Sequence, residues 1–399
     1  MDGGDVTTSG TGRESEWPSN VGKLTDDIVS AAEEIDESGR IPSRVLQRMH
    51  EVGAFRLLIP RSLDGFEMNL IGFMETIEQF ARIDASVAWC IGQASGCSFS
   101  AAYLDHAVAR EIFGPVNAVV AWGPPSQDSR AVIVEGGHKL YGSWMYASGS
   151  RQATWLGAHA KIFDAAGEPY RGASGAQVEK TFMFPSSVAQ IDDVWQVLGL
   201  RGTGSDTYSL DGHFVPDTHA YLRDSDMARR EQGPLYQLPI LGTFAIAFAA
   251  VALGIARATM DSFVDLATVK TPKARSVLLR DSVVVQLHVG SCEARLRSAR
   301  CYLERTIEIL SDSLASGHGV STSDRLNLRM AVTHAIQECR DIVTKTYVAA
   351  GAAAIFEKNG FEKRFRDMHA VSQQIQGHAV NLETAGQVLL GVPGVAPRI

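Results

Sequence analysis

The sequence has few cysteines and lacks the short motifs that mark metal or nucleotide sites. Its five cysteines among 399 residues form no C-x-x-C pair, which is typical of a reducing compartment, so we expect a cytoplasmic protein with free thiols. No H-E-x-x-H sequence or Cys/His ligand set occurs, and we expect no metal. Neither G-x-G-x-x-G nor G-x-x-x-x-G-K-[ST] is present, which leaves dinucleotide-binding and P-loop folds without support.

The chain also lacks an excess of basic residues. Its formal net charge of −8, with both signs interspersed, argues against nucleic acid or an anionic membrane as the main partner. One long uncharged run, residues 238–256, is rich in Ala and interrupted by Gly and Pro, and it predicts a buried helix rather than a membrane span. Residues 1–19 are polar and rich in Gly, Ser and Thr without the pattern of a secretory signal, and we expect a disordered tail.

Three regions differ in the spacing of their apolar residues. Residues 20–116 show helical spacing, 117–228 show short alternating groups between Gly, Pro, Asp and Ser clusters, and 229–399 show long helical stretches. We therefore expect an α+β fold with an N-terminal helical domain, a central antiparallel β-domain and a C-terminal four-helix bundle. The bundle helices are expected at 240–268, 276–315, 322–353 and 361–390. The expected core-facing residues of the first region are Leu24, Ile28, Val29 and Ala32, then Phe73, Ile77, Phe80 and Ala81.

Four stretches together resemble the acyl-CoA dehydrogenase superfamily and, within it, the two-component flavin-dependent monooxygenases. The helical stretch that starts "IPSRVLQRMHEVGAF" is similar to the family's opening, and "YGSWMYASGSRQATWLG" is similar to its central β-segment. "VWQVLGLRGTGSDTYSLDGHFVP" resembles its most specific signature, and "RFRDMHAVSQQ" its Arg-Asp-x-His segment. The four occur in the family's order over nearly all of the chain after the tail. The resemblance implies the family fold and a bound flavin.

The resemblance also implies which residues meet the flavin. Ser148 in "YASGS" matches a Ser that hydrogen-bonds near flavin N5, with a plain Ser-Gly turn as the alternative. The loop "VVAWGPP" would lie over the ring, unless it is a hairpin corner with a core Trp. Arg201 suits a phosphate or carboxylate, or else an acidic residue across the domain junction. The complete set of expected cofactor contacts is Trp122, Gly123, Ser148, Gly149, Arg201, Thr203, Ser205 and Arg275, the last of these in a basic helix start that could equally be an exposed turn.

The C-terminal segment favours an oxygenase over a dehydrogenase. Dehydrogenases of the commonest subgroup carry a Glu base in a Tyr-Glu-Gly-Thr type segment, whereas this chain reads "SQQIQGHAVNLETAG" and Glu383 lies outside such a motif. Related aromatic hydroxylases carry a His eight residues after the Arg of the Arg-Asp-x-His segment, and Gln374 stands there. Gln374 could orient a substrate, and His378 could supply a base if the helix continued one turn. Trp89 and His369 are expected substrate contacts, with a core or structural role as the alternative.

These features predict a flavin-dependent monooxygenase without a reductase domain of its own. The resemblance implies that a separate NAD(P)H flavin reductase supplies reduced FMN or FAD, which reacts with O2 to a C4a-hydroperoxide. An aromatic or polycyclic small molecule from secondary metabolism or aromatic catabolism would then be hydroxylated or otherwise oxidised. A homotetramer built through the long helices is also implied. The alternatives are an acyl-CoA dehydrogenase and a relative that oxidises the nitrogen of an amino sugar.

Overall fold

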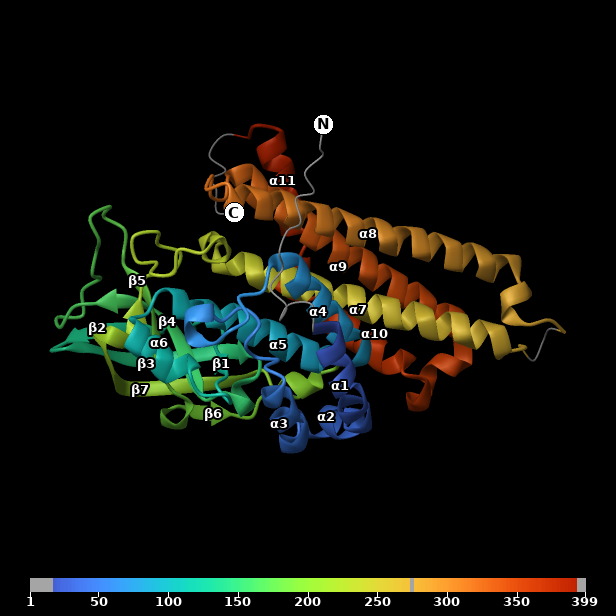
Figure 1. The fold of residues 1–399 in the computed structure, drawn as a ribbon, viewed down its shortest axis with the longest axis horizontal. Coiled ribbons are helices and arrows are strands. Elements are labelled where there is room, and N and C mark those ends of the chain that lie inside the picture. Colours follow the sequence, from blue (N-terminus) through green and yellow to red (C-terminus); the bar gives the residue numbers. More distant parts are fainter. Residues whose placement is uncertain (1–16, 273–275, 393–399) are drawn as a thin grey trace, which may run out of the picture.

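The computed structural model describes residues 17–272 and 276–392 as helices, a β-sheet and a long helical domain. Figure 1 shows the sheet at one end of an elongated molecule, the long C-terminal helices extending to the other end, and the N-terminal helices packed between them. The expected fold class is confirmed in this arrangement. One hydrophobic core joins the N-terminal helices to the C-terminal ones, and a second core lies in the sheet.

Six α-helices lie between residues 17 and 113, and the first of them begins earlier than expected. Trp17–Ser19, predicted to belong to the tail, lie in the first helix, and the Trp17 ring is buried against Phe66. The rest of the expected tail lies outside the described residues. Val29, predicted to face the core, is exposed, because it follows the buried Ile28 around the helix. The helices are α1 (Trp17–Ser30), α2 (Ala32–Ser38), α3 (Ser43–Glu51), α4 (Leu70–Ile83), α5 (Ala85–Cys97) and α6 (His106–Phe113).

The central sheet has eight strands and is mixed rather than purely antiparallel. Its order is β6-β7-β3-β2-β4-β5-β8, with β1 pairing β4 off this path. The pairs β1–β4 and β2–β4 are parallel, and the other pairs are antiparallel. The strands are β1 (Val120–Ala121), β2 (Arg130–Val134), β3 (Gly137–Ala147), β4 (Trp155–Phe163), β5 (Glu179–Pro185), β6 (Gln190–Asp192), β7 (Asp206–Pro216) and β8 (Ala220–Tyr221).

The described part of the C-terminal domain contains three long α-helices and two short ones. They are α7 (Ile240–Val269), α8 (Val283–Ala315), α9 (Thr322–Ala350), α10 (Phe361–Val371) and α11 (Val380–Leu389). The single helix expected at 361–390 is therefore wrong: the chain leaves the helix after Val371, makes a short 3-10 turn at Ile375–Gly377, and begins α11 at Val380. Gly377 packs so closely that a Cβ there would lie 2.9 Å from a methyl carbon of Ile336.

The long apolar helix α7 is a core helix. It is apolar enough to cross a membrane by composition, but 83% of its most apolar window is buried inside the protein. Small residues bring it close to the N-terminal helices. A Cβ added at Gly254 would lie 2.4 Å from the Glu78 carbonyl oxygen of α4, and one added at Gly92 of α5 would lie 2.8 Å from the Ala247 Cβ. This close packing fixes the side chains of α5 and α7 that face the sheet.

Candidate active site

A pocket of about 710 Å³ opens where α5 and α7, the sheet and the segment after α10 meet. Its volume lies within the range of about 300–1,000 Å³ usual for small-molecule and cofactor sites. Hydroxyl groups from two turns, several aromatic rings and four glutamines contribute to its lining. Large apolar walls with few polar groups are typical of such sites.

The hydroxyl groups form one directed chain of hydrogen bonds. The Thr203 hydroxyl donates to the Leu200 carbonyl oxygen over 2.8 Å, so it can only accept from Ser205, whose oxygen lies 2.7 Å away. Ser205 therefore accepts from Ser148, also at 2.7 Å, and Ser148 accepts from the Trp89 indole N–H at 3.0 Å. Every hydrogen in the chain is used, which leaves Ser148 and Ser205 each a lone pair with which to accept from a ligand.

Backbone contacts join the two turns that carry these hydroxyls. The Gly149 N–H donates to the Thr203 carbonyl oxygen over 2.8 Å, and Gly149 adopts the left-handed conformation with φ of 80°. Tyr146 and Leu200 also have positive φ, at 55° and 54°, and both line the pocket. Strained backbone of this kind in non-glycine residues is concentrated at functional sites. The turn 200–205 and the end of β3 therefore form one preorganised rim.

The Arg-Asp-x-His segment of α10 holds this rim in place. Asp367 is buried and accepts a hydrogen bond of 2.7 Å from the Leu200 N–H, while Lys363 bridges Asp367 at 2.8 Å and Asp84 at 3.0 Å. Arg366 donates to the Leu198 carbonyl oxygen over 2.9 Å. Burial raises the pKa of Asp367, which the positive charge of Lys363 partly offsets. The α10 segment thus positions the turn 200–205 through contacts with its backbone at Leu198 and Leu200.

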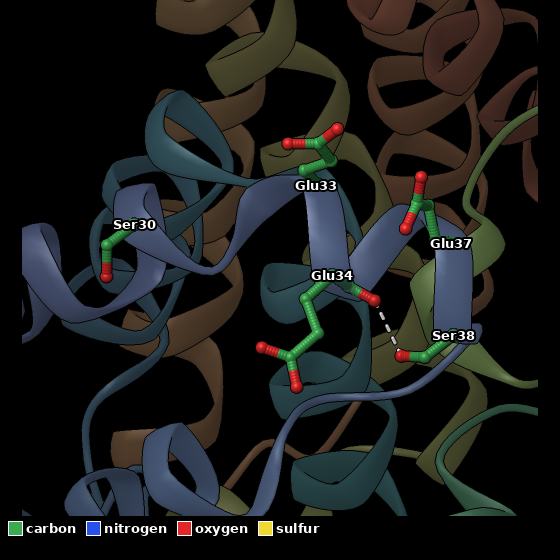
Figure 2. Close-up of a pocket in the computed structure, with 5 residues that line it drawn as sticks. All are labelled: Ser30, Glu33, Glu34, Glu37 and Ser38. Atoms are coloured by element: carbon green, nitrogen blue, oxygen red, sulfur yellow. Dashed lines mark hydrogen bonds between the residues drawn. The ribbon is translucent and has the colours of Figure 1, made fainter.

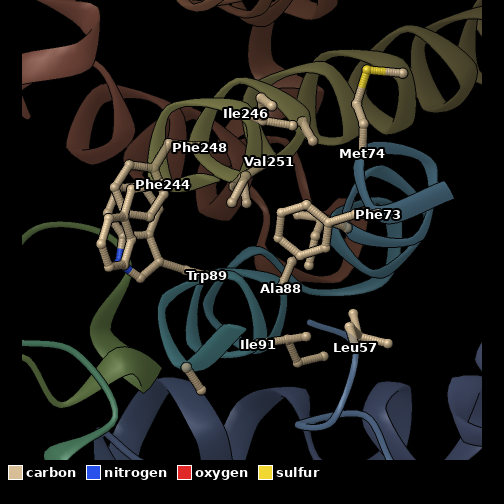
Figure 3. Packing of buried hydrophobic residues seen from close by; sticks show 14 of the residues in the cluster. Leu57, Phe73, Met74, Ala88, Trp89, Ile91, Phe244, Ile246, Phe248 and Val251 are labelled. Atoms are coloured by element: carbon tan, nitrogen blue, oxygen red, sulfur yellow. The ribbon is translucent and has the colours of Figure 1, made fainter. Parts of the chain in front are cut away.

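Aromatic side chains form one wall of the pocket. Trp89 and Phe248 stack with centroids 3.8 Å apart and planes 5° apart, and Phe244 lies 6.1 Å from Phe248 and 6.3 Å from Trp122. Figure 3 shows Trp89, Phe244 and Phe248 gathered where α5 approaches α7. The loop carrying Trp122 passes very close to β3, because a Cβ at Gly123 would lie 1.7 Å from the Met145 carbonyl oxygen. Only glycine fits there.

A buried histidine and an ion pair contribute the polar groups at another part of the lining. His159 Nε2 lies 3.1 Å from Arg223 Nη1, and its Nδ1 lies 2.7 Å from the Thr181 hydroxyl. Because arginine only donates, Nε2 is the acceptor and Nδ1 carries the proton. Burial, and then the positive charge of Arg223, lowers the pKa of His159 well below its usual value. Arg223 also contacts Glu179, with nitrogen and oxygen 3.3 Å apart.

The segment after α10 presents glutamines, not a histidine, to the pocket. Gln374 lines it, with its Oε1 accepting from the Gln376 N–H over 2.8 Å and its buried Nε2 without a protein partner. The expectation that His378 replaces the family base on a continuing helix is wrong, because the helix has ended. His378 is exposed, lies outside the lining, and accepts from the Val380 N–H at the start of α11.

His369 also lies away from the pocket, contrary to its expected contact with substrate. Its Nε2 is 3.1 Å from the Thr344 hydroxyl of α9, and its ring lies 4.3 Å from that of Phe365. It therefore packs α10 against α9, the structural alternative. Trp89, the other expected substrate contact, does line the pocket.

Most of the expected cofactor residues are brought together. The pocket lining includes Trp122, Gly123, Ser148, Thr203 and Ser205. Gly149 is outside the lining and donates to the carbonyl oxygen of the lining residue Thr203. Arg201 is exposed and outside the lining, whereas Gly202 and Thr203 of the same turn are buried. Arg151 of the neighbouring turn pairs with Asp206 at 2.6 Å and donates to the Ser38 carbonyl oxygen of α2 over 3.1 Å. Arg275 lies outside the described residues.

These residues fit a flavin ring. An isoalloxazine is flat and apolar on its faces, which suits walls such as Trp89 and Phe248, and its polar edge needs hydrogen-bond partners. Ser148 and Ser205 offer open acceptor positions, and the unpaired Nε2 of Gln374 offers a donor. The glycine at position 123 lets backbone approach closely where a side chain would intrude.

A second, open hollow lies on the N-terminal helices and has a different character. Ser30, Glu33, Glu34, Glu37 and Ser38 line it. Figure 2 shows the carboxylates of the three glutamates projecting from α2 without converging on one point. Within residues 17–272 and 276–392, no group of three or more His, Cys, Asp or Glu side chains is placed to hold a metal ion. The hollow offers no counterpart to the enclosed pocket.

Several lining residues were not predicted from the sequence. Phe244 and Phe248 lie four residues apart in the uncharged run 238–256, so their helical spacing and size could have singled them out. His159 is a lone polar residue at an inward position of an apolar strand. Arg223 follows a two-residue strand with no local pattern, and only the fold brings it to His159.

Comparisons with known proteins agree with this geometry. The sequence matches the family profiles "Acyl-CoA dehydrogenase, N-terminal domain" over residues 16–111 and "Acyl-CoA dehydrogenase, C-terminal domain" over residues 246–379. Indole-3-acetate monooxygenase of Pseudomonas putida is 27% identical over 358 residues, 90% of this chain and 89% of that protein. The flavin-dependent monooxygenase oxygenase subunit HsaA of Rhodococcus jostii is 24% identical, over 90% of this chain and 93% of that protein.

A solved structure has the same fold. XiaF from Streptomyces sp., in complex with FADH2 and glycerol, superposes with a TM-score of 0.88 at 22% identity and covers 97% of both chains.

Proposed function

Because the chain belongs to the acyl-CoA dehydrogenase family and, within it, to the oxygenase components of flavin-dependent monooxygenases, we propose that its pocket oxidises an aromatic small molecule. The observation that carries this proposal is the meeting of an aromatic wall with an ordered hydroxyl edge in one pocket. When bound, reduced FMN or FAD supplies the electrons that activate O2, and one oxygen atom is transferred to the substrate. HsaA and indole-3-acetate monooxygenase, by their names, carry out reactions of this class.

Each part of the lining has a defined task in this proposal. Ser148 would accept a hydrogen bond from the N5–H of the reduced ring with its open lone pair, while the indole of Trp89 keeps its hydroxyl pointing toward Ser205. Gln374 would donate from Nε2 to an oxygen atom of the substrate. The apolar rings exclude water, and a dry, preorganised site limits loss of activated oxygen as H2O2.

The lining argues against the two alternatives. An acyl-CoA dehydrogenase needs a carboxylate base, and Glu179, the carboxylate that lines the pocket, is paired with Arg223. The C-terminal segment contributes glutamines 373, 374 and 376, which do not act as bases at neutral pH. A wall of stacked aromatic rings suits a flat aromatic substrate better than an amino sugar.

The proposal is tested by supplying chemically reduced FMN or FAD to the protein in air-saturated buffer. We expect the absorbance of oxidised flavin to recover more slowly than it does without protein, because the pocket protects the reacting flavin. The tighter-binding flavin identifies the cofactor. Recovery at the rate of free flavin, with one H2O2 released per flavin, would contradict the proposal. Bleaching of bound oxidised flavin by an acyl-CoA without a reductase would favour the dehydrogenase.

The oxygenase component implies a separate flavin reductase, which we propose uses NAD(P)H. We also propose a cytoplasmic homotetramer. Apolar side chains are exposed where α7 ends, α8 begins and α9 ends, and we call them the bundle-end patch. They are 72–76% exposed and comprise Val269, Val283, Val284, Leu287 and Val348. Exposed apolar patches of this kind commonly mark protein interfaces.

A further inference from the structure

The pocket lining includes one basic and one acidic side chain, Arg223 and Glu179, and they differ in their exposure to solvent. Arg223 and Glu179 both line the pocket, and His159 beside them is held neutral by burial and by Arg223. Asp224 interacts electrostatically with Arg223 but does not line the pocket. The Arg223 side chain is 30% exposed and the Glu179 side chain 43%. Arg223 is thus the more enclosed charge, and Glu179 lies nearer to solvent.

His159 orients the Arg223 guanidinium by accepting a hydrogen bond from it. His159 Nε2 takes one N–H of the guanidinium at 3.1 Å, and His159 is itself fixed by the Thr181 hydroxyl at 2.7 Å. Glu179 takes a second N–H at 3.3 Å. An arginine has five N–H donors, so within the described residues the guanidinium keeps donors for a further acceptor. A neutral histidine orients the cation without cancelling its charge.

Glu179 has another partner available if a ligand displaces it. Glu179 of β5 lies directly opposite Lys161 of β4 in the antiparallel register. Side chains directly opposite each other on neighbouring strands share a face and lie about 5 Å apart at their Cβ atoms. Lys161 is exposed, and a turn of the Glu179 side chain toward it would free one edge of the Arg223 guanidinium.

Aromatic rings connect this cation to the serine end of the pocket. From Ser148 the contacts run to Trp89, then to Phe248 and Phe244, then to Trp122. The Trp122 ring lies 5.1 Å from that of His159, which contacts Arg223. A ligand lying along this wall would place a ring among the aromatic side chains and a substituent at the guanidinium.

We propose that Arg223, oriented by His159, binds a carboxylate on the side chain of the aromatic substrate, so that the substrate class is aromatic acids. This inference extends the proposed function and rests on it in one respect, namely that the bound aromatic acid is the substrate of the reaction. Arginine binds carboxylates in a two-point geometry, and a charge-assisted pair of this kind in an enclosed site discriminates strongly against a neutral analogue.

The test measures binding to the flavin-free protein by titration calorimetry. The probes are aromatic acids of different ring size, phenylacetate, indole-3-acetate and naphthalene-1-acetate, each compared with its primary amide. We expect at least one acid to bind about 10- to 100-fold more tightly than its amide. Arg223→Met should remove this preference and leave the affinity for the amide unchanged. Failure of every acid to bind better than its amide overturns the proposal.

Two further variants separate ligand binding from a structural ion pair. Glu179→Gln removes the competing carboxylate and should keep or strengthen the preference for the acid. Arg223→Lys keeps the charge without the two-point geometry and should retain only part of the preference. If Arg223→Met and Glu179→Gln lower the unfolding midpoint equally and neither changes the ratio of acid to amide affinity, the pair is structural and the proposal is wrong.

Failure of this inference can be distinguished from failure of the proposed function, because the calorimetry uses no flavin. Selective binding of acids by a protein that only releases H2O2 would refute the oxygenase and keep the acid site. Coupled oxidation of neutral aromatics with no preference for acids would support the oxygenase and refute the acid site.

Discussion

Ser148 combines a fixed hydrogen with a free lone pair, and this determines what it can do for a ligand. Its hydrogen is committed to Ser205, and its oxygen already accepts from Trp89. The side chain is 6% exposed. A ligand N–H can therefore be bound without disturbing the chain, whereas a ligand acceptor would have to reverse it. This favours the reduced, N–H-bearing form of the ring over the oxidised form.

Ser148→Ala removes this acceptor and should uncouple the reaction. We expect the fraction of reduced flavin that yields product to fall at least about tenfold, with a matching rise in H2O2, because a hydrogen bond at the reacting edge is lost. Product and H2O2 are measured in single-turnover mixing. Ser150→Ala is the matched control, since Ser150 donates to the Gly204 carbonyl oxygen outside the pocket lining. Equal coupling in both variants would exclude Ser148 from the reaction.

His159 should make the protein sensitive to acid. Burial and Arg223 lower its pKa well below 6.5, so the folded protein keeps it neutral where the unfolded chain binds a proton. Above pH 6.5 His159 is neutral in both states, and the free energy of unfolding does not depend on it. Below pH 6.5 the unfolded chain gains a proton there, and the free energy of unfolding decreases by about 1.4 kcal/mol per pH unit from this group. Urea unfolding across this range should show a shallower decrease for His159→Gln. Exposed His318→Gln should keep the slope of the wild type.

Among the elements, the contact between α10 and the turn 200–205 holds the hydroxyl edge of the pocket in place. Lys363 bridges two buried carboxylates, Asp84 at the start of α5 and Asp367 in α10, and Asp367 holds the Leu200 N–H. Three segments far apart in sequence are thereby tied together behind the hydroxyl edge. The arrangement explains why an Arg-Asp-x-His segment accompanies a Gly-rich turn.

Lys363→Met should destabilise the protein by about 3–5 kcal/mol, because it leaves buried carboxylates without their cation. Chemical denaturation measures the loss. Arg305→Met, which removes an exposed ion pair with Glu308, should cost no more than about 1 kcal/mol. A cost for Lys363→Met no larger than that of Arg305→Met would show that the bridge does not hold the rim.

The sequence predicts the elements that local periodicity determines, and it does not predict features that depend on contacts between residues far apart in the chain. Periodicity located the helices and the sheet, because one face of each element is buried in a large core. The resemblance to the flavin-dependent monooxygenases places the turns "LRGTGS" and "YASGS" at one flavin site, and both carry the small residues and hydroxyls that such a site needs. The break after Val371 was missed, since only the packing of Gly377 against Ile336 shows that the helix cannot continue. Arg223 was missed because its partner His159 is 64 residues away.

At the scale of the whole molecule, the N-terminal helices and the long C-terminal helices share one core, and the sheet has its own. The pocket lies where these two bodies meet, so small movements of one against the other would alter its walls. The bundle-end patch belongs to the C-terminal ends of α7 and α9 and the N-terminal end of α8. Figure 1 shows these helix ends at the end of the molecule away from the sheet.

Leu287→Glu should disrupt self-association, because it places a charge in the bundle-end patch, where Leu287 is 72% exposed. We expect the tetramer to dissociate to a smaller species, measured by size exclusion with light scattering. Arg297→Glu, on the same helix with a side chain 76% exposed, is the control that should keep the wild-type mass. A monomeric wild type at every concentration would remove this proposal.

Transfer of one oxygen atom from O2 to an aromatic substrate, with reduced flavin in the pocket, is the reaction that we propose. The direct measurement supplies reduced flavin and isotopically labelled O2 to the protein with a panel of aromatic acids, and analyses the products by mass spectrometry. We expect a product that carries one labelled oxygen atom, formed by the wild type and strongly reduced in Ser148→Ala. Unlabelled products, or H2O2 alone with every aromatic compound, would contradict it.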